Sequence, residues 1–217
     1  MFDFHVHSIF SDGVLIPSEI CRRYVSKGFK AIAITDHCDV SNLEDVILPM
    51  KKFVSSLPGD YPLRVFCGVE LTHLPVSLIS PMVREARGLG ADIVVVHGET
   101  ITEPVEQGTN RAAIEAEADI LAHPGFIARE DAMLAAEKGV LLEVTTRKGH
   151  SYANGWVAKI AGEVGAGLIV NNDAHTPADI LDYTQMIAIA KASGLDGIEG
   201  IVSKNAQDLF ERISSVV

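Results

Sequence analysis

The chain has 217 residues, of which 47% are hydrophobic and 22% are charged, a balance typical of a folded protein and not of a disordered segment. The 18 Lys and Arg residues against 29 Asp and Glu give a formal net charge of −11, which argues against a protein that holds nucleic acid on a broadly basic surface. This length favours one domain over residues 1–217, and no apolar run is long enough to span a bilayer.

Three cysteines, Cys21, Cys38 and Cys67, give an odd count without a CxxC pair. We therefore expect neither a disulfide framework nor a thiolate zinc cluster, and the pattern favours a reducing compartment. Residues 1–5 enter a strand pattern directly, without the basic and apolar regions of a signal peptide. Together these features predict a cytoplasmic protein.

In chain order, short runs rich in Val, Ile and Leu alternate with helical patterns. Apolar residues on both faces are typical of parallel strands that are covered on both sides. The first predicted helix has Pro17 at its start, Ile20 and Tyr24 at helical spacing, and Gly28 just beyond its end. We expect residues 197–202 to form a loop that caps the last helix rather than an eighth strand. The seven predicted strands are residues 2–6, 31–35, 64–69, 92–96, 119–122, 140–145 and 168–172.

Two fold classes alternate strands and helices in this way, the barrel and the doubly wound sheet. A dinucleotide-binding sheet would carry a Gly-rich phosphate loop after its first strand, and a P-loop protein would carry a GK[ST] sequence. Neither is present, because the first predicted strand runs into His-Val-His-Ser-Ile-Phe-Ser-Asp-Gly.

Ionisable residues gather where the predicted strands end. Residues two apart in a strand share a face, so Asp3, His5 and His7 are expected to point the same way. The carboxyl ends of barrel strands meet at one mouth, and Asp12 of the first βα loop can join the side chains placed there. The other members of this group follow later strands: His37, Glu70, His97, His123, Asp173 and His175.

This group predicts a metal centre. Buried polar groups without partners cost roughly 1–3 kcal/mol each, and shared metal ions would satisfy them together. Imidazole and carboxylate ligands without thiolate suit Zn²⁺, Mn²⁺ or Fe²⁺. Nine candidate ligands exceed what one ion takes, so two or three ions are implied, and Glu70 could bridge two of them. Such clusters hold a hydroxide between ions for attack on a phosphoryl group.

The same residues resemble the motifs of the polymerase and histidinol phosphatase (PHP) family over nearly the whole chain. The first motif is His5-Val-His7-Ser8 with Ser11-Asp12-Gly13, and the second is Thr35-Asp36-His37. The remaining motifs are Gly68-Val69-Glu70, Val96-His97-Gly98, Ala122-His123-Pro124 and Asn172-Asp173-Ala174-His175.

The resemblance implies an α/β fold, a distorted seven-stranded (β/α) TIM-like barrel of PHP type, with a trinuclear metal site. It implies a first ion held by His5, His7, Glu70 and Asp173. Glu70 would bridge to a second ion on His97 and His123, and a third ion would bind Asp12, His37 and His175. Members of the family hydrolyse phosphoesters, among them histidinol phosphate, nucleotides and DNA 3′ ends.

Other polar residues are candidates for supporting roles. Arg147, Lys148 and His150 follow the sixth strand and are candidates for binding the substrate phosphate, as is Arg129 more weakly. Glu143 ends the sixth strand, where it could contact a ligand residue, the substrate or a metal. Asp3 and Asp36 could each orient a metal-bound imidazole or make an ordinary polar contact. His73 is interpreted as structural, and Glu99 as a possible mouth residue without an assigned role.

The leading hypothesis is a metal-dependent phosphatase acting on a small phosphorylated metabolite, a histidinol-phosphate-like monoester. Asp12, Glu70 and His175 are the residues expected to take part in the chemistry, with Asp12 or a metal-held water protonating the leaving group. A nuclease or nucleotide phosphatase is the alternative within this class. An amidohydrolase and a metal-free scaffold, such as the related barrel subunit of ribonuclease P, are alternatives outside it.

Overall fold

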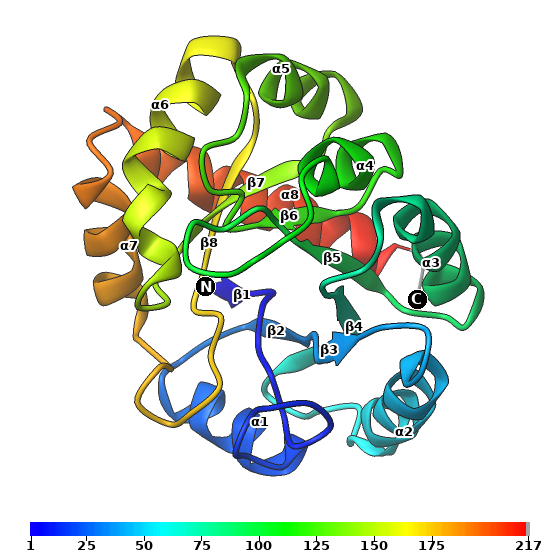
Figure 1. The fold of residues 1–217 in the computed structure, drawn as a ribbon. Coiled ribbons are helices and arrows are strands. Elements are labelled where there is room, and N and C mark those ends of the chain that lie inside the picture. The colour runs from blue at the N-terminus through cyan, green and yellow to red at the C-terminus, as the bar shows by residue number, and fades with distance from the viewer. Residues whose placement is uncertain (216–217) are drawn as a thin grey trace.

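A nearly closed barrel of parallel strands, surrounded by helices, forms the body of the computed structural model, which describes residues 1–215 (Figure 1). The strands are β1 (Phe2–Asp3), β2 (Ala31–Ile34), β3 (His37–Cys38), β4 (Arg64–Leu71), β5 (Ile93–His97), β6 (Ile120–Ala122), β7 (Leu141–Thr145) and β8 (Leu168–Asn171). The helices are α1 (Pro17–Ser26), α2 (Leu43–Ser56), α3 (Val76–Gly88), α4 (Thr109–Glu115), α5 (Arg129–Lys138), the short 3-10 turn η1 (His150–Ala153), α6 (Asn154–Val164), α7 (Tyr183–Ala192) and α8 (Ile198–Ser214).

The strand order is β1-β2-β4-β5-β6-β7-β8, all parallel, with the short β3 added beside the end of β4. Backbone contacts beyond β1 and β8 bring the two ends of the sheet together. Val6 and Ala174 form a parallel bridge, and the amide of His7 donates to the carbonyl of Ala174 at 2.9 Å. The predicted seven-stranded α/β barrel is therefore confirmed.

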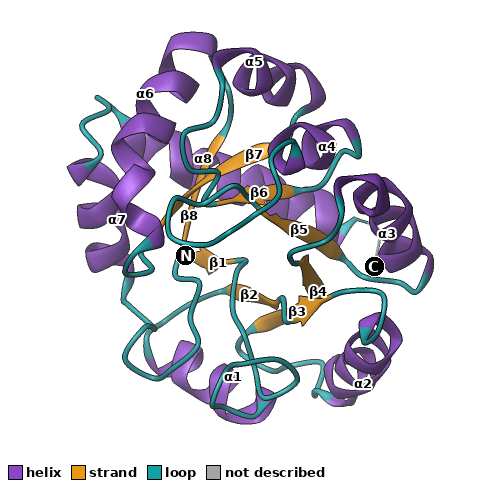
Figure 2. Cartoon of the chain, viewed as in Figure 1, coloured by secondary structure: helices purple, strands orange, loops and turns teal. Residues whose placement is uncertain are grey.

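Side chains alternate between the inside of the barrel and the helices around it. Ala33, Phe66 and Val95 belong to the inner cluster, whereas Ile32 and Ile34 pack in the outer one beneath the helices. Strands buried on both faces explain the continuous apolar runs of the sequence. Figure 2 shows the helices outside the strands.

Helix α8 closes the amino ends of the strands. Its Leu209 and Ile213 pack into the inner cluster, and Asn205 donates to the carbonyl of Leu168, the first residue of β8. The carboxyl ends of the strands are left to carry the polar side chains. Within residues 1–215, no helix is long and apolar enough to cross a membrane.

Two local predictions are wrong. Residues 197–202 are not a loop, because α8 begins at Ile198 immediately after Gly197, whose φ of +73° stops helical geometry on its amino side. Ile198 and Val202 are both 1% exposed, one helical turn apart, so burial of this apolar pair outweighs the glycines. His37 does not end the second strand either, since it begins the separate strand β3, in register with Glu70.

The expected common face is confirmed for His5 and His7, whose Nε2 atoms both face Glu70 and Asp173, but is wrong for Asp3. Strand β1 ends at Asp3, and Phe4 enters the inner cluster, so the two-residue alternation breaks before His5. Asp3 instead accepts from the hydroxyl of Tyr24 on α1 at 2.6 Å and from Asn172 Nδ2 at 2.8 Å. It makes a polar contact between β1, α1 and the end of β8 and orients no imidazole through its side chain.

Candidate metal centre

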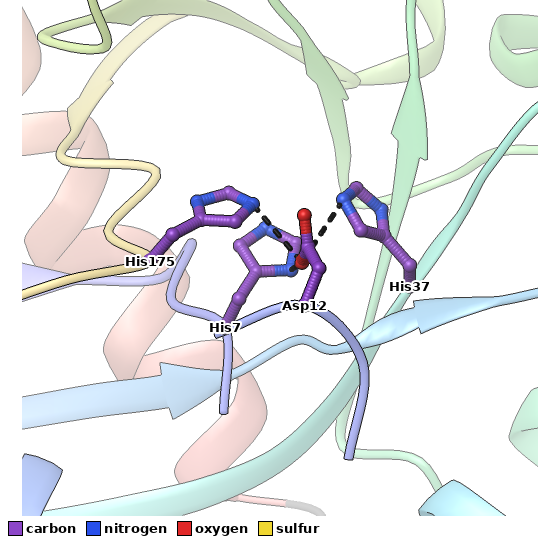
Figure 3. A group of neighbouring side chains, drawn as sticks. All are labelled: His7, Asp12, His37 and His175. Carbon is purple, nitrogen blue, oxygen red and sulfur yellow. Dashed lines mark ion pairs between the residues drawn. The ribbon is translucent and has the colours of Figure 1, made fainter. Parts of the chain in front are cut away.

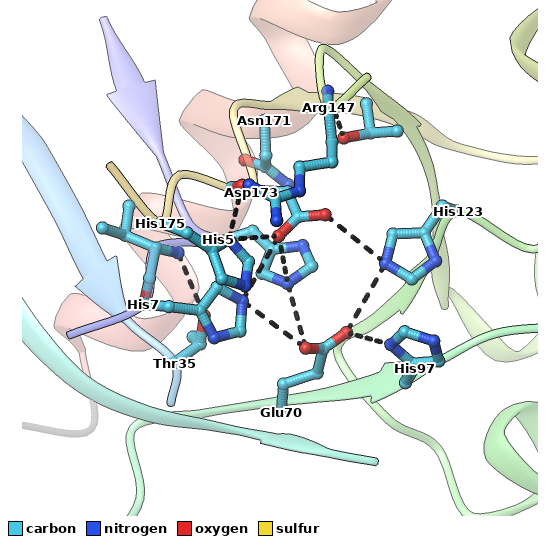
Figure 4. Close-up of polar contacts among 12 residues, drawn as sticks. His5, His7, Thr35, Glu70, His97, His123, Arg147, Asn171, Asp173 and His175 are labelled. Atoms are coloured by element: carbon cyan, nitrogen blue, oxygen red, sulfur yellow. Dashed lines mark hydrogen bonds and ion pairs between the residues drawn. The ribbon is translucent and has the colours of Figure 1, made fainter. Parts of the chain in front are cut away.

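The carboxyl ends of the strands bring all nine predicted ligands to one mouth. Glu70 comes from the end of β4 and His97 from the end of β5, while His123 directly follows β6 and Asp173 lies two residues beyond β8. Most of these side chains are buried, and Asp12, with 55% of its side chain exposed, is the most open. Figure 4 shows the imidazoles arranged around the Glu70 carboxylate.

Glu70 lies at the centre of the group. Its Oε2 is 3.3 Å from His5 Nε2 and 3.5 Å from His7 Nε2. Its Oε1 is 3.2 Å from His97 Nδ1 and 3.7 Å from His123 Nε2. Burial opposes ionisation of this carboxyl, but the surrounding imidazoles, led by His5, hold the pKa of Glu70 well below its usual range. A buried carboxylate with imidazoles on both oxygens can bridge two cations.

Asp173 faces Glu70 across the mouth. Its Oδ1 is 3.3 Å from His7 Nε2, and its Oδ2 is 3.7 Å from His123 Nε2. Both Asp173 and His123 have left-handed backbone, with φ of +51° and +28°. Such conformations cost about 1–3 kcal/mol for residues other than glycine and persist where the surroundings enforce them. Burial raises the pKa of Asp173 to about 7.

A second group of ligand atoms lies at the outer edge, as Figure 3 shows. Asp12 Oδ1 is 3.2 Å from His175 Nε2, 3.6 Å from His37 Nε2 and 3.9 Å from His7 Nδ1. The four ligand atoms all lie within 4.8 Å of one another. They are close enough to share one ion.

Hydrogen bonds to Asp36 hold the loop that carries Asp12. The Asp36 carboxylate accepts from the amide and hydroxyl of Ser8, both at 2.7 Å, and from the hydroxyl of Ser11 at 2.7 Å. Gly13 is required for this packing, because a Cβ there would lie 2.4 Å from the carbonyl oxygen of His7. Asp36 therefore positions the loop and does not contact an imidazole.

Unpartnered buried atoms test whether metal ions fit this site. Among residues 1–215, several buried ligand atoms have no hydrogen-bond partner: His5 Nε2, both nitrogens of His7, His97 Nε2, His123 Nδ1 and Glu70 Oε2. The unpartnered nitrogens of His5 and His7 face carboxylates at 3.3–3.9 Å, without hydrogen-bond geometry. Each unpaired group costs about 1–3 kcal/mol. Divalent cations would satisfy the atoms that face Glu70, Asp173 and Asp12, so the residues fit a metal cluster, whereas His97 Nε2 points to Glu103 at 3.1 Å.

The outward nitrogens of several imidazoles have partners. His5 Nδ1 lies 2.9 Å from Glu143 Oε1, His37 Nδ1 lies 2.6 Å from Thr72 Oγ1, and His175 Nδ1 lies 3.0 Å from the carbonyl of Asp173. A metal-bound imidazole keeps a proton on its other nitrogen and needs such an acceptor. His5 and His175 leave Nε2 for the mouth, whereas His37 Nδ1 also lies 2.8 Å from Glu70 Oε2, so both nitrogens of His37 face carboxylates of the mouth. Glu143 therefore lies behind His5 and away from the solvent.

The candidates for phosphate binding lie in different surroundings. His150 stacks on His123 with 4.2 Å between ring centroids. Arg147 pairs at 3.2 Å with Asp179, whose carboxylate also accepts from the amide of His175. Lys148 is exposed beside them, whereas Arg129 is engaged by Glu163 of α6 at 2.5 Å and not by a residue of the cluster.

Glu99 and His73 differ from their interpretation in the sequence, and both differences lie in the loops around the mouth. Glu99 accepts from the amides of Gly108 and Asn110 and so holds the start of α4 rather than facing the mouth. Glu103, which no sequence motif marks, lies against His97 Nε2 at 3.1 Å. His73 also contacts Glu103, at 3.2 Å, so it has a polar partner at the mouth. A glutamate inside an irregular loop carries no periodic signal, so its place could not be predicted.

Comparison with known proteins identifies the family. The model of the PHP domain matches residues 3–212, and the chain therefore belongs to the PHP domain family. The resemblance expected from the motifs is confirmed.

Among curated proteins, the uncharacterized protein MJ1295 of Methanocaldococcus jannaschii is 44% identical over 98% of this chain and 99% of its own length. The DNA polymerase/3'-5' exonuclease PolX of Bacillus subtilis is 23% identical over 94% of this chain, which spans only 41% of that protein.

Solved structures share the fold. A chain of archaeal ribonuclease P with mature tRNA superposes with a TM-score of 0.75 at 16% identity, covering 100% of this chain and 93% of that one. Histidinol phosphate phosphatase of Lactococcus lactis, complexed with zinc, L-histidinol and phosphate, superposes with a TM-score of 0.63 at 16% identity, covering 89% and 94%.

Proposed function

We propose that this protein is a metal-dependent phosphoesterase that hydrolyses a small phosphomonoester of the histidinol-phosphate kind. The observation that carries the proposal is the set of buried, unpartnered ligand atoms around Glu70. A barrel that keeps such atoms away from water without a cation would forfeit stability at each one. The zinc bound in the structurally similar histidinol phosphate phosphatase supports a divalent metal at this site.

Three ions would bind in overlapping groups. His5, His7, Glu70 and Asp173 would hold the first, and Glu70 with His97 and His123 the second. Asp12, His37 and His175 would hold the third, with His7 beside it. Zn²⁺, Mn²⁺ or Fe²⁺ suits these ligands and would supply Lewis acidity and an activated water for attack on phosphorus.

The protein's own groups would orient the substrate and deliver the proton. Arg147 offers a guanidinium fork suited to phosphate oxygens, and Lys148 and His150 lie on the same loop. Burial would raise the pKa of Asp12, but the hydrogen bond from His175 and the charge of His37 outweigh it and lower that pKa. An ionised Asp12 suits cation binding, so a water held at the mouth is the better proton donor for the leaving group.

A second candidate is a nuclease or nucleotide phosphatase. It is favoured by the sequence similarity to PolX, an exonuclease by name, and by the fold shared with a chain of ribonuclease P. The net charge of −11 argues against a long nucleic acid lying across the surface. A metal-free scaffold is disfavoured because every ligand position of the pattern is filled.

Elemental analysis of the purified protein, combined with hydrolysis of p-nitrophenyl phosphate and bis-p-nitrophenyl phosphate, tests the proposal. We expect about two to three divalent ions per chain and turnover of the monoester with added Mn²⁺ or Zn²⁺. Preferential turnover of the diester would support the nuclease instead. A protein that binds no metal and hydrolyses neither substrate would contradict both.

A further inference from the structure

Glu103 lies outside the nine proposed ligands, on the loop between β5 and α4. Its carboxylate touches imidazoles from three parts of the mouth. Oε2 is 3.1 Å from His97 Nε2 and 3.2 Å from His73 Nε2, and Oε1 is 3.4 Å from His150 Nε2. His73 follows β4 and His150 begins η1, so Glu103 joins three βα connections through one side chain.

His97 lies between two carboxylates. Its Nδ1 faces Glu70 at 3.2 Å and its Nε2 faces Glu103 at 3.1 Å, while only 3% of the side chain is exposed. His5 also lies between two carboxylates, with a hydrogen bond between Nδ1 and Glu143 at 2.9 Å, whereas the contact of His97 Nε2 with Glu103 is an ion-pair distance without hydrogen-bond geometry. An imidazole that offers one nitrogen to a cation keeps its proton on the other, where a carboxylate fixes the ring and raises its basicity. At His97 the carboxylate in that place is Glu103.

We propose that Glu103 is the positioning residue for His97. It holds Nδ1 toward Glu70 and so strengthens binding of the ion assigned to Glu70, His97 and His123; this inference rests on the proposed metal centre. His73 and His150 hold Glu103 from either side. With the proton of His97 on Nε2, Glu103 would act through His97. Glu103, His73 and His97 also lie close enough together to share an ion, and the test below separates the two roles.

The test compares Glu103→Gln with Glu106→Gln, which removes an equal charge from an exposed position of the same loop. Zinc binding is measured by competition with a chromophoric chelator, with elemental analysis at saturation. We expect Glu103→Gln to bind as many ions as the wild type, one of them about 10–100-fold more weakly. Glu106→Gln should match the wild type, and Glu103→Asp should recover part of the lost affinity.

A second comparison uses His97→Ala as background. If Glu103 acts through His97, adding Glu103→Gln to His97→Ala should change zinc affinity no further. An undiminished effect in that background, or an equal loss in Glu106→Gln, would overturn the proposal. Loss of a whole ion at saturation would also overturn it and make Glu103 a direct ligand with His73. If the wild-type protein binds zinc but hydrolyses no phosphomonoester, the proposed function is refuted while the role of Glu103 still stands, because the comparisons of variants measure zinc affinity and not hydrolysis.

Discussion

At the scale of single residues, the mouth depends on Glu70. Strand β4 is the longest of the barrel, and Glu70 lies one position before its end, beside β3 and β5. Its neighbours therefore present imidazoles to both carboxylate oxygens. The charge of Glu70 is tolerated in a buried place because those imidazoles surround it, and the ligands depend on one another for partners.

The loss of one ligand should therefore be visible in both metal content and activity. His123→Ala removes the imidazole that faces both Glu70 and Asp173 at 3.7 Å. We expect one ion fewer per chain and phosphomonoester hydrolysis reduced at least about 100-fold. Loss of a residue that only hydrogen-bonds to a metal ligand costs up to about 100-fold, and loss of the ligand itself should cost at least as much. The control is His73→Ala, whose imidazole is 42% exposed and should leave the number of ions at saturation unchanged. Unchanged metal content in His123→Ala would contradict the assignment.

The cysteines behave as buried apolar residues. Cys21 and Cys67 are at most 1% exposed, and burial raises the pKa of each thiol to about 12. Since the thiolate is the reactive form, we expect the native protein at pH 8 to react negligibly with 5,5′-dithiobis-(2-nitrobenzoic acid). In denaturant all three cysteines, including Cys38, should react. Rapid labelling of the folded protein would show that these sites open to solvent.

At the scale of elements, α8 lies at the end of the barrel opposite the proposed metal centre. It covers the amino ends of the strands through Leu209 and Ile213, and Arg212 pairs at 3.0 Å with Asp119, just before β6. The ligands lie at the carboxyl ends. In barrels of this type the carboxyl face carries the site and the amino face contributes stability.

Leu209→Ala should consequently destabilise the protein without emptying the metal centre. Leu209 is 2% exposed, and truncation of a buried leucine lowers the free energy of unfolding by about 2–5 kcal/mol. Ile201→Ala, on the same helix but 37% exposed, should cost well under about 2 kcal/mol. Urea unfolding with elemental analysis measures both. A loss of metal in folded Leu209→Ala would show that the two ends of the barrel are coupled.

The elements also show how far the sequence could predict this structure. Apolar runs on both faces identified the seven main strands, and polar residues at the strand ends marked the residues proposed as ligands, because both signals are periodic or positional. Strand β3 is too short for a period, and the start of α8 was hidden by Gly197 and Gly200 although Ile198 and Val202 are buried. The role of Glu103 depends on where an irregular loop folds back, which local sequence does not encode.

At the scale of the whole molecule, a net charge of −11 and a mouth lined with imidazoles and carboxylates both favour cations over anions. Without cations, the unpartnered atoms around Glu70 lower the stability of the barrel that encloses them. Binding to the folded state alone adds stability of RT ln(1 + [L]/Kd), about 4 kcal/mol at a thousandfold excess over Kd. The centre should therefore act as a stabilising element of the fold as well as a reactive one.

Chelation should reveal this coupling. Treatment with EDTA and removal of the chelator should lower the unfolding temperature by several degrees, and added Zn²⁺ or Mn²⁺ should restore it. Imidazoles bind metal only when unprotonated, so the stabilisation by metal should be large at pH 8 and shrink as the pH falls toward 5. Differential scanning calorimetry at both pH values measures the difference, with Mg²⁺ as the control ion because it binds imidazole poorly. Equal unfolding temperatures with and without metal at pH 8 would mean that the unpartnered atoms of the proposed ligands do not lower the stability of the barrel.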